Sequence, residues 1–569
     1  MNKKDFKLSI GSLEKGHFYN FIIETSSRFG DKPVFFGRKP NLNKATDEWY
    51  SVSYNQILEQ AEAVARKLHI LGLQKGDKVL IIGKSKPEFS FGFCAIPLAG
   101  GVIVPLDPRL SLNDQKYICE FSQAKFVVCT NDESLGVATK IIEALGPHQV
   151  LKLFMIDNHE DFQIKKEAQF TPQKAIDLKH SCITREEMML MTFTSGTTNL
   201  PKGVMLSWNN LDFQIQALQA VYSEKTDFRM LSILPIYHLF ELVAGFLLPY
   251  ASGGEVFYGN SLLPHQVMLF IKQKKIRDLL VVPLFLRTLK KGLLNEILST
   301  LPRKIWFKLT FALASLIPSL SIRRVLFFPL HRFFGGELRQ MISGASALDQ
   351  GVGRFFDILG ISIYEGYGMT EASPVICCSS RFHKKPGSIG KPLSGLELKL
   401  HSETNEILVR GPSIMLGYFN DPQSTFETVD PEGWLRTGDI GDIDKDGFVS
   451  IKGRNKDTIV LGNGKKIFPD ELEEVFRKIP GVQEVCVLGI PSNYGATKGT
   501  EVVLTIIVPR PEHSQEEIEE LLRIASQQLS YFKRPTKFVF FKEPLPTTST
   551  LKIKKNVLRE ILIKQRINV

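Results

Sequence analysis

The sequence predicts an α/β protein with a large N-terminal domain of mixed sheets covered by helices and a smaller α+β C-terminal domain. The chain has 569 residues, too many for one compact core. Short apolar runs bounded by glycine alternate with stretches of helical periodicity. The pattern changes near residues 450–460, where shorter units begin. Its 43% hydrophobic and 23% charged content is typical of a globular protein and argues against disorder.

The large domain begins with a helix followed by a buried strand. YNQILEQAEAVARKLHILGL (54–73) has apolar residues at helical spacing and ends near Gly72. GDKVLIIGKS (76–85) is a short apolar run between glycines, which is typical of a buried parallel strand. PEFSFGFCAIPLAGGVIVPLDP (87–108) continues as helix, turn and strand. The later runs KFVVC, LKLFMID, MLMTFTS, DLLVVP and LRQMISGA repeat the pattern and predict mainly parallel sheets.

The small domain follows KGRNKD (452–457), which is charged and predicts the joint between the domains. VQEVCVLGIP (482–491) and EVVLTIIVP (501–509) predict strands, and a helix is expected over 514–530.

Charge and cysteine content limit the location and the partners. The net charge is +11, from 71 basic and 60 acidic residues, and favours anionic partners without choosing among them. The seven cysteines include no C-x-x-C pair, which predicts free thiols in a reducing compartment and no zinc site. The first residues lack the apolar run of a signal peptide, and no stretch reaches the ~18 apolar residues of a membrane span. We therefore expect a cytoplasmic protein or one on the inner face of a membrane.

Residues 288–336 combine basic and apolar side chains in an unusual density. Between Lys290 and Arg332 there are eight basic residues and one acid, Glu296. The uncharged window 309–322 would span about 21 Å as a helix, which is shorter than the ~30 Å core of a bilayer, and Pro318 would interrupt it. The segment predicts a helical insertion on an anionic membrane or over an apolar cavity, or else a core hairpin with basic ends.

Three familiar motifs are excluded by spacing. GKS (83–85) lacks the first glycine of a Walker A loop. DIDKDG (442–447) lacks the glutamate that closes an EF-hand loop. Ser195 lies in no G-x-S-x-G turn, so the sequence gives little support to a hydrolase.

The stretch TFTSGTTNLPKGVMLS (192–207) has the hydroxyls, glycines and single lysine of a loop that holds phosphate. Six other stretches carry chemistry at a turn: LPIYHLFE, MISGASA, YEGYGMTEASP, GWLRTGDIG, GRNKD and PLPTTSTLKIKK. In this order, from about residue 15 to about 565, they resemble the adenylate-forming enzymes, which include acyl-CoA synthetases, peptide-synthetase adenylation domains and luciferases. The resemblance implies an AMP-binding domain over 1–455 and a mobile C-terminal domain over 456–569 that carries the catalytic lysine.

The resemblance also implies roles for individual residues. The β- and γ-phosphates of ATP would be held by Thr194, Ser195, Gly196, Thr197, Thr198 and Lys202. The adenine would lie between Tyr367, followed by Gly368, and the turn formed by Gly344, Ala345 and Ser346. Asp439 and Arg454 would bind the ribose, Thr370 would contact the α-phosphate, and Glu371 would ligate Mg²⁺. Lys552 would bridge the substrate carboxylate and the α-phosphate, His238 would lie beside that carboxylate, and Lys456 would be the hinge.

The expected reaction joins a medium- or long-chain fatty acid to a phosphopantetheine thiol through acyl-AMP. The apolar segment 290–335 and TTSTLK, where many relatives have Ser-Gly before the lysine, resemble fatty acyl members. The acceptor is coenzyme A or acyl carrier protein, because both end in the same arm, and no nucleic acid partner is implied. The alternatives are another carboxylic acid, a non-catalytic lipid-binding or membrane scaffold of the same fold, and a luciferase-type oxidase, for which nothing in the sequence supports the oxygen chemistry.

Asn199 replaces the usual glycine of this phosphate loop. If the position needs a positive φ, asparagine is the non-glycine residue that tolerates it best. We expect Asn199→Val to impair ATP use far more than Asn199→Gly, as measured by KM for ATP. The reverse order would show that the asparagine side chain itself acts.

Overall fold

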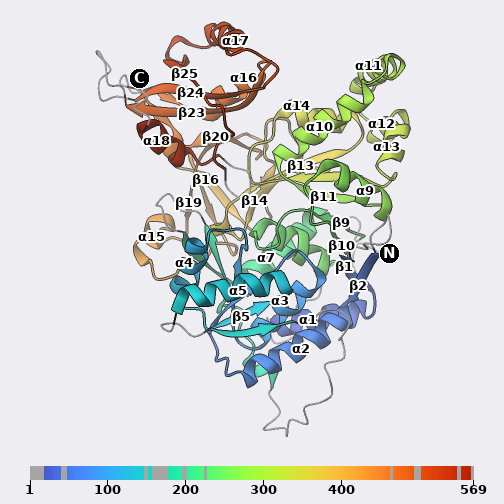
Figure 1. The fold of residues 1–569 in the computed structure, drawn as a ribbon, viewed down its shortest axis with the longest axis vertical. Helices are drawn as coiled ribbons and strands as arrows, with labels where there is room; N and C mark the ends of the chain where they lie inside the picture. Colours follow the sequence, from blue (N-terminus) through green and yellow to red (C-terminus); the bar gives the residue numbers. More distant parts are fainter. Residues whose placement is uncertain are drawn as a thin grey trace.

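The computed structural model of the protein describes residues 18–39, 48–146, 151–156, 177–194, 201–222, 227–461, 465–491, 501–547 and 553–564. It confirms the predicted α/β class, with sheets and helices in a large N-terminal part and a smaller C-terminal part above it in Figure 1. The predicted domain boundary at 455/456 falls within the short helix η4 (Asn455–Asp457) and stays a prediction.

One sheet of the large part has seven strands, in the order β18-β8-β7-β4-β3-β5-β6. Its members are β3 (Lys78–Ile82), β4 (Val102–Leu106), β5 (Phe126–Cys129), β6 (Lys152–Met155), β7 (Met188–Thr194), β8 (Lys202–Ser207) and β18 (Gly417–Tyr418). Strands β3 to β7 run parallel, whereas β8 and β18 join antiparallel at one edge. The parallel centre is almost wholly buried, as its continuous apolar runs predict.

The second sheet has nine strands, in the order β15-β14-β13-β12-β11-β9-β10-β1-β2. Its members are β1 (Pro33–Lys39), β2 (Glu48–Ser53), β9 (Arg229–Ser232), β10 (Glu255–Tyr258), β11 (Asp278–Val281), β12 (Gln340–Ser343), β13 (Ser362–Gly368), β14 (Val375–Cys378) and β15 (Lys391–Pro392). The strands from β1 to β13 pair in parallel, and β2, β14 and β15 pair antiparallel. The carboxyl ends of its parallel strands therefore meet at one edge, where ligands bind in such sheets.

Helices cover these sheets and join their strands. The larger part contains α1 (Phe18–Phe29), α2 (Tyr54–Ile70), α3 (Pro87–Leu98), α4 (Leu112–Ser122), α5 (Asp132–Leu145), α6 (Leu178–Ser181), α7 (Trp208–Tyr222), π-helix η2 (Glu241–Leu247), α8 (Leu248–Ala251), α9 (Pro264–Lys274) and α14 (Gln350–Ile358). Helix α2 begins at a capping box, in which Ser53 accepts from the amide of Gln56 and the Gln56 side chain accepts from the Ser53 amide. All residues of α3 are buried, because this helix packs inside the main apolar core.

The chain then forms a four-stranded antiparallel sheet and the C-terminal part. The sheet has the strand order β16-β17-β19-β20. Its members are β16 (Glu397–Leu400), β17 (Glu406–Arg410), β19 (Leu435–Ile443) and β20 (Val449–Arg454). The short helix η3 (Thr370–Ala372) precedes these strands in the chain, and α15 (Pro422–Thr428) lies between β17 and β19 in sequence. The C-terminal part contains β21 (Ile459–Val460), β22 (Lys466–Ile467), α16 (Pro469–Arg477), β23 (Val482–Pro491), β24 (Glu501–Pro509), α17 (Gln515–Gln527), η6 (Tyr531–Lys533), β25 (Lys537–Phe540) and α18 (Lys555–Lys564). The C-terminal part has two apolar clusters of its own, one on each face of β23 and β24.

The predicted helical insertion contains four helices: α10 (Pro283–Ile297), α11 (Leu301–Leu316), α12 (Leu320–Leu326) and α13 (Phe328–Phe333). The window 309–322 is not one helix, because α11 ends at Leu316 before the predicted break at Pro318. Among the described residues, no helix is long and apolar enough to cross a membrane. All seven cysteines are buried, and they are free thiols, as predicted from the sequence.

Candidate functional site

Tyr367, Asp439 and Arg454, which are far apart in the sequence, lie in direct contact. The Tyr367 hydroxyl donates to Asp439 Oδ2 at 2.7 Å, and Arg454 Nε lies 3.1 Å from Asp439 Oδ1. Asp439 and Arg454 are also paired across β19 and β20, so the backbone register holds their side chains together. The carboxylate is buried with both oxygens engaged, which makes it a fixed acceptor for neighbouring hydroxyl groups.

The turn that presents Asp439 is held by polar contacts on each side. Thr437 Oγ1 accepts from the Asp439 amide at 3.1 Å and donates to the Ile407 carbonyl at 2.8 Å. Gly438 adopts a φ of 71°, and its amide donates to Glu406 Oε1 at 2.9 Å. A carboxylate held this way keeps one orientation whether or not a ligand is present.

Two glycines of the predicted adenine site are needed for close packing. A side chain at Gly368 would place its Cβ 1.8 Å from the Pro374 carbonyl oxygen. A side chain at Gly344 would come within 2.9 Å of the Phe240 ring. Gly344 and its neighbours Ala345, with a φ of 71°, and Ser346 follow directly on β12. Because β12 pairs in parallel with β13, this turn and Tyr367 lie at neighbouring strand ends.

Lys202 and Glu371 are joined through a residue that sequence reasoning missed, Tyr418. The Tyr418 hydroxyl donates to Glu371 Oε1 at 2.8 Å, and Lys202 Nζ lies 5.0 Å from the centre of the Tyr418 ring. Lys202 Nζ also lies 2.5 Å from Ser424 Oγ and 3.6 Å from Asp421 Oδ2. Tyr418 comes here because β18 pairs with β8, an arrangement that no local motif in residues 417–418 signals.

The described part of the predicted phosphate loop consists of its two ends. Thr194 at the end of β7 pairs with Lys202 at the start of β8, and the two strands are antiparallel. Ser195, Gly196, Thr197 and Thr198 lie outside the described residues, as does Lys552. Their roles stay predictions.

His238 is half-buried in a group of aromatic and charged side chains after β9. Its ring centre is 5.1 Å from that of Tyr237, which in turn stacks under the Arg109 guanidinium at 5.5 Å. Asp107 accepts from Arg109 Nε at 3.2 Å. Burial lowers the pKa of His238 to about 4, and the Asp107 carboxylate only partly opposes this shift. At neutral pH the imidazole is therefore uncharged and can orient a partner by a hydrogen bond but not by charge.

Lys456 has an exposed side chain whose ammonium group feels the charge of two carboxylates of the site. Burial, followed by the repulsion of Arg454, lowers its pKa, whereas Asp439 and Glu371 both act in the opposite direction. Both carboxylates are thus within electrostatic range of the same ammonium group. Thr370 is half-buried beside Glu371 in η3, so Thr370, Glu371, Asp439 and Lys456 belong to one region.

Glu241, at the start of π-helix η2, is a buried carboxyl that the sequence did not single out. Among the described residues neither carboxyl oxygen has a partner at hydrogen-bond distance, although the Ser232 hydroxyl is near enough to oppose the shift of its pKa. A Cβ at Gly245 would lie 2.4 Å from one of these oxygens. Burial raises its pKa from 4.5 to about 8. π-helical turns are often found at functional sites, and this one directly follows His238.

The raised pKa of Glu241 predicts a pH-dependent stability. Between pH ~4.5 and ~8 the folded protein holds a proton that the unfolded chain releases, so stability falls as pH rises through this window. Across the whole window the free energy of unfolding should fall by an amount on the order of 3–5 kcal/mol. Glu241→Gln should remove the contribution of this carboxyl group to the dependence of the unfolding free energy on pH, as measured by urea unfolding between pH 5.5 and 8.5. Glu59→Gln, at an exposed position on α2, should keep the wild-type slope; equal slopes in all three proteins would contradict the assignment.

Glu406, Tyr418, Asp421 and Ser424 are the contributors that sequence reasoning missed. The Asp421-Pro422 pair signals a helix start, and Asp421 does cap α15, accepting from the Ser424 amide. Nothing local to these residues indicates that α15 would face Lys202, since that contact depends on strand pairing across more than two hundred residues.

Comparison with known proteins shows which family this chain matches. Residues 23–419 match the family model of the AMP-binding enzymes, and residues 471–552 match that of the AMP-binding enzyme C-terminal domain. The chain is 27% identical to a long-chain-fatty-acid–CoA ligase of Bacillus subtilis, over 95% of this chain and 94% of that protein. It is 25% identical to a 4-coumarate–CoA ligase of Humulus lupulus (96% and 94%) and 26% identical to a feruloyl-CoA synthase of Amycolatopsis (93% and 98%).

Solved structures agree on the fold. The ATP-bound chimera RpMatB-BxBclM aligns with a TM-score of 0.73 at 25% identity, covering 96% of this chain and 99% of that one. The o-succinylbenzoate CoA synthetase of Bacillus subtilis, in complex with its acyl-adenylate, aligns with a TM-score of 0.73 at 22% identity, covering 95% and 98%.

Proposed function

The chain belongs to the family of AMP-binding, adenylate-forming enzymes, and we propose that it is an ATP-dependent ligase of medium- or long-chain fatty acids. The first step joins a carboxylate oxygen to the α-phosphorus of ATP and breaks the bond to pyrophosphate. In the second step a thiol sulfur attacks the acyl carbon, loses its proton, and displaces AMP.

The contact of Tyr367, Asp439 and Arg454 carries the proposal. A nucleotide needs an aromatic face for the base and a fixed carboxylate for the ribose hydroxyls, and this group offers both at adjoining positions. Asp439 would accept from the ribose while Tyr367 and Arg454 hold it in place. The turn at Gly344, Ala345 and Ser346 would cover the other face of the adenine.

The phosphates would lie toward Lys202, Thr194 and Glu371. Phosphoryl transfer depends on positioning and charge neutralisation more than on a protein nucleophile. Lys202 supplies a cation whose present partners, Ser424 and Asp421, are exchangeable because the side chain is partly exposed. Lys552 would neutralise the α-phosphate and the substrate carboxylate, and Thr370 would donate a hydrogen bond there.

A Mg²⁺ ion fits Glu371 as a single protein ligand. Glu371 Oε1 accepts from Tyr418, which leaves Oε2 for a cation. Within the described residues no group of three or more His, Cys, Asp or Glu side chains could hold a metal alone. That agrees with Mg²⁺, which keeps several waters and binds through one or two carboxylates together with substrate phosphates. When bound, the ion would offset the negative charge of the phosphates.

A fatty acid is the substrate that both the sequence and the relatives favour. Several long-chain-fatty-acid–CoA ligases match at 26–27% identity, but the 4-coumarate and feruloyl enzymes match almost as well. The basic and apolar segment α10–α13 supports the fatty acid and, with it, peripheral association of a cytoplasmic enzyme with a membrane. Coenzyme A is the acceptor named for the relatives, and acyl carrier protein is the alternative because it carries the same arm.

One experiment separates these options. Protein, ATP and Mg²⁺ are incubated with octanoate, palmitate, 4-coumarate and ferulate, with coenzyme A and acyl carrier protein in parallel. Pyrophosphate release with palmitate and thioester on one acceptor is the expected result. Folded protein that binds ATP but releases no pyrophosphate with any acid would instead support the non-catalytic scaffold.

A further inference from the structure

Helix α11 exposes large apolar side chains on the face opposite the one that packs on the protein. Its buried residues, Phe307 and Ala314, mark the inner face. Exposed leucines and an isoleucine recur every three or four residues along the outer face: Leu301, Ile305, Leu309, Leu313 and Leu316. At about 100° per residue this spacing forms one stripe along the helix. A helix at the surface of a globular domain normally carries polar residues on that face.

The exposed apolar side chains continue from α11 onto α12 and α13. Among the described residues, 12 of the 26 exposed large apolar side chains lie between Leu298 and Phe333. Leu316 is 82% exposed, Val325 73% and Phe328 61%. Such a concentration in one short segment marks an interaction surface, since scattered exposed apolar residues are ordinary but clustered ones are not.

Basic side chains lie beside the same stripe. Lys304 and Lys308 lie along one border of it, and the segment between Lys290 and Arg332 carries eight basic residues against one acid, a net charge of +7. In the part of the chain that the structure describes, none of these eight forms an ion pair with a carboxylate. Lys290, Arg323 and Arg324 donate to backbone carbonyls of the protein. The other five basic residues are exposed and available to an external anionic surface: Lys291, Arg303, Lys304, Lys308 and Arg332.

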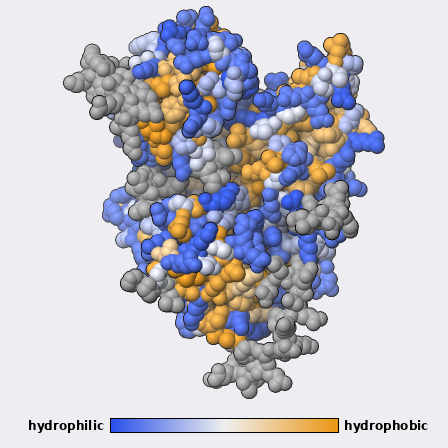
Figure 2. All heavy atoms as spheres, viewed as in Figure 1, coloured by the Kyte–Doolittle hydropathy of each residue, from blue (hydrophilic) through white to orange (hydrophobic). Residues whose placement is uncertain are grey.

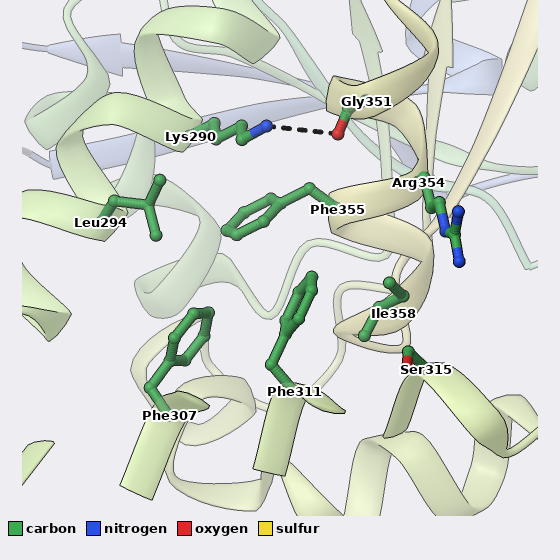
Figure 3. Close-up of a pocket in the computed structure, with 9 residues that line it drawn as sticks. All are labelled: Lys290, Leu294, Phe307, Phe311, Ser315, Gly351, Arg354, Phe355 and Ile358. Carbon is green, nitrogen blue, oxygen red and sulfur yellow. Dashed lines mark hydrogen bonds between the residues drawn. The ribbon is translucent and has the colours of Figure 1, made fainter. Parts of the chain in front are cut away.

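Helix α11 joins the main apolar core through its inner face, where Phe307 and Ala314 are buried and Phe311 packs against them. A cavity of about 470 Å³ lies beneath it, between α10, α11 and α14, and Phe307, Phe311 and Phe355 line the cavity (Figure 3). Figure 1 shows α11 projecting from the edge of the large part, and Figure 2 shows hydrophobic residues at this tip beside hydrophilic ones. The apolar residues on the outer face are 51–82% exposed, so most of their surface is left uncovered by the protein. A core hairpin with basic ends, one reading of the sequence, does not describe α11.

We propose that α11, with α12 and α13, docks on the surface of a bilayer that contains anionic phospholipids. The 16 residues of α11 span about 24 Å, which is shorter than a bilayer core, so the helix lies in the interface with its leucines among the acyl chains. The lysines and arginines then face the lipid phosphates. A convex, projecting tip enters a fluid surface without needing the complementary groove that a protein partner would have to supply. The docking would bring the enzyme to the membrane in which its proposed substrate dissolves.

The test measures binding of the full chain to vesicles by flotation, without ATP or acid. Vesicles of phosphatidylcholine alone are compared with vesicles that contain phosphatidylglycerol. Wild-type protein should bind the anionic vesicles at least tenfold more strongly. Leu309→Glu with Leu316→Glu should lower that binding at least tenfold, whereas Phe426→Glu with Ile524→Glu, exposed apolar residues on α15 and α17, should leave it unchanged.

A second pair of variants tests the charge. Lys304→Glu with Lys308→Glu should remove most of the preference for anionic vesicles. Lys140→Glu with Lys445→Glu changes the net charge equally at exposed positions elsewhere and should keep the preference. Thermal melts show that each variant is folded. Failure of the wild type to bind anionic vesicles, or equal losses in test and control pairs, would overturn the proposal; a silent ligase assay would not, because binding is measured by itself.

Discussion

Lys552→Ala is expected to lower acyl-adenylate formation by roughly 10²–10³-fold, while thioester formation from supplied acyl-AMP largely persists. The expectation follows from the proposed role of Lys552, which is to neutralise charge between the carboxylate and the α-phosphate during the first step only. In this family the small domain is expected to rotate about Lys456 between the two steps, so that Lys552 leaves the site. Pyrophosphate exchange measures the first step, and thioester formation from synthetic acyl-AMP measures the second.

The neighbouring lysines supply the control. Lys554 is exposed, so Lys554→Ala should leave both steps unchanged. Lys555 is unsuitable, because it forms a 3.0 Å ion pair with the buried Glu473 in the C-terminal part. Its loss would leave that buried carboxylate with only the more distant Arg477, at 3.6 Å, among its recorded ion-pair partners. If Lys552→Ala impaired both steps equally, the assignment of Lys552 to the first step alone would be wrong.

The regular elements of the fold could be predicted from the sequence because their signals are local. The run KVLII forms β3 with four of its five residues buried, and the helix expected before it forms α2 with its capping box. Glycine before and after such a run marks where the strand can end. The predicted helix at 514–530 corresponds to α17, which begins at the Ser514 cap.

The contacts within the site could be predicted only where the family resemblance supplied them. Tyr367 and Asp439 are 72 positions apart, and their hydrogen bond depends on how β13 and β19 come together. Tyr418 has no motif of its own, yet it links Glu371 and Lys202 because β18 joins the edge of the seven-stranded sheet. Such pairings are set by the whole fold, and a local pattern carries no information on them.

Glu241 shows a different limit of sequence reasoning. In LPIYHLFELVAGFLLP the glutamate is the one acidic residue of a mostly apolar run, and no motif marks it. The structure places it wholly inside, in a π-helical turn where Gly245 leaves room for its carboxyl group. Every residue of this π-helix is buried, so the turn has no exposed face, and no local pattern marks Glu241 as an enclosed carboxyl group.

Asp439→Asn is expected to weaken ATP binding by about 10²–10⁴-fold. Two hydrogen bonds from the ribose to a charged acceptor contribute roughly 1.5–3 kcal/mol each. Asparagine keeps the size of the side chain but offers one acceptor oxygen, and its amide group faces the donors of Arg454 or Tyr367 instead of accepting from them. Titration calorimetry with ATP and Mg²⁺ measures the change.

The control for this variant lies on the same strand. Asp442 is exposed on β19, and Asp442→Asn should bind ATP as the wild type does. Asp439→Asn also disturbs the contacts of Arg454, so a thermal melt must show that the protein remains folded before the affinity is interpreted. A folded Asp439→Asn protein that binds ATP within about twofold of the wild type would be inconsistent with ribose recognition, since even one lost charged hydrogen bond corresponds to a change of more than tenfold. The contact with Tyr367 and Arg454 would then be a structural link between the two sheets, and the nucleotide would have to be sought nearer Lys202 and Glu371.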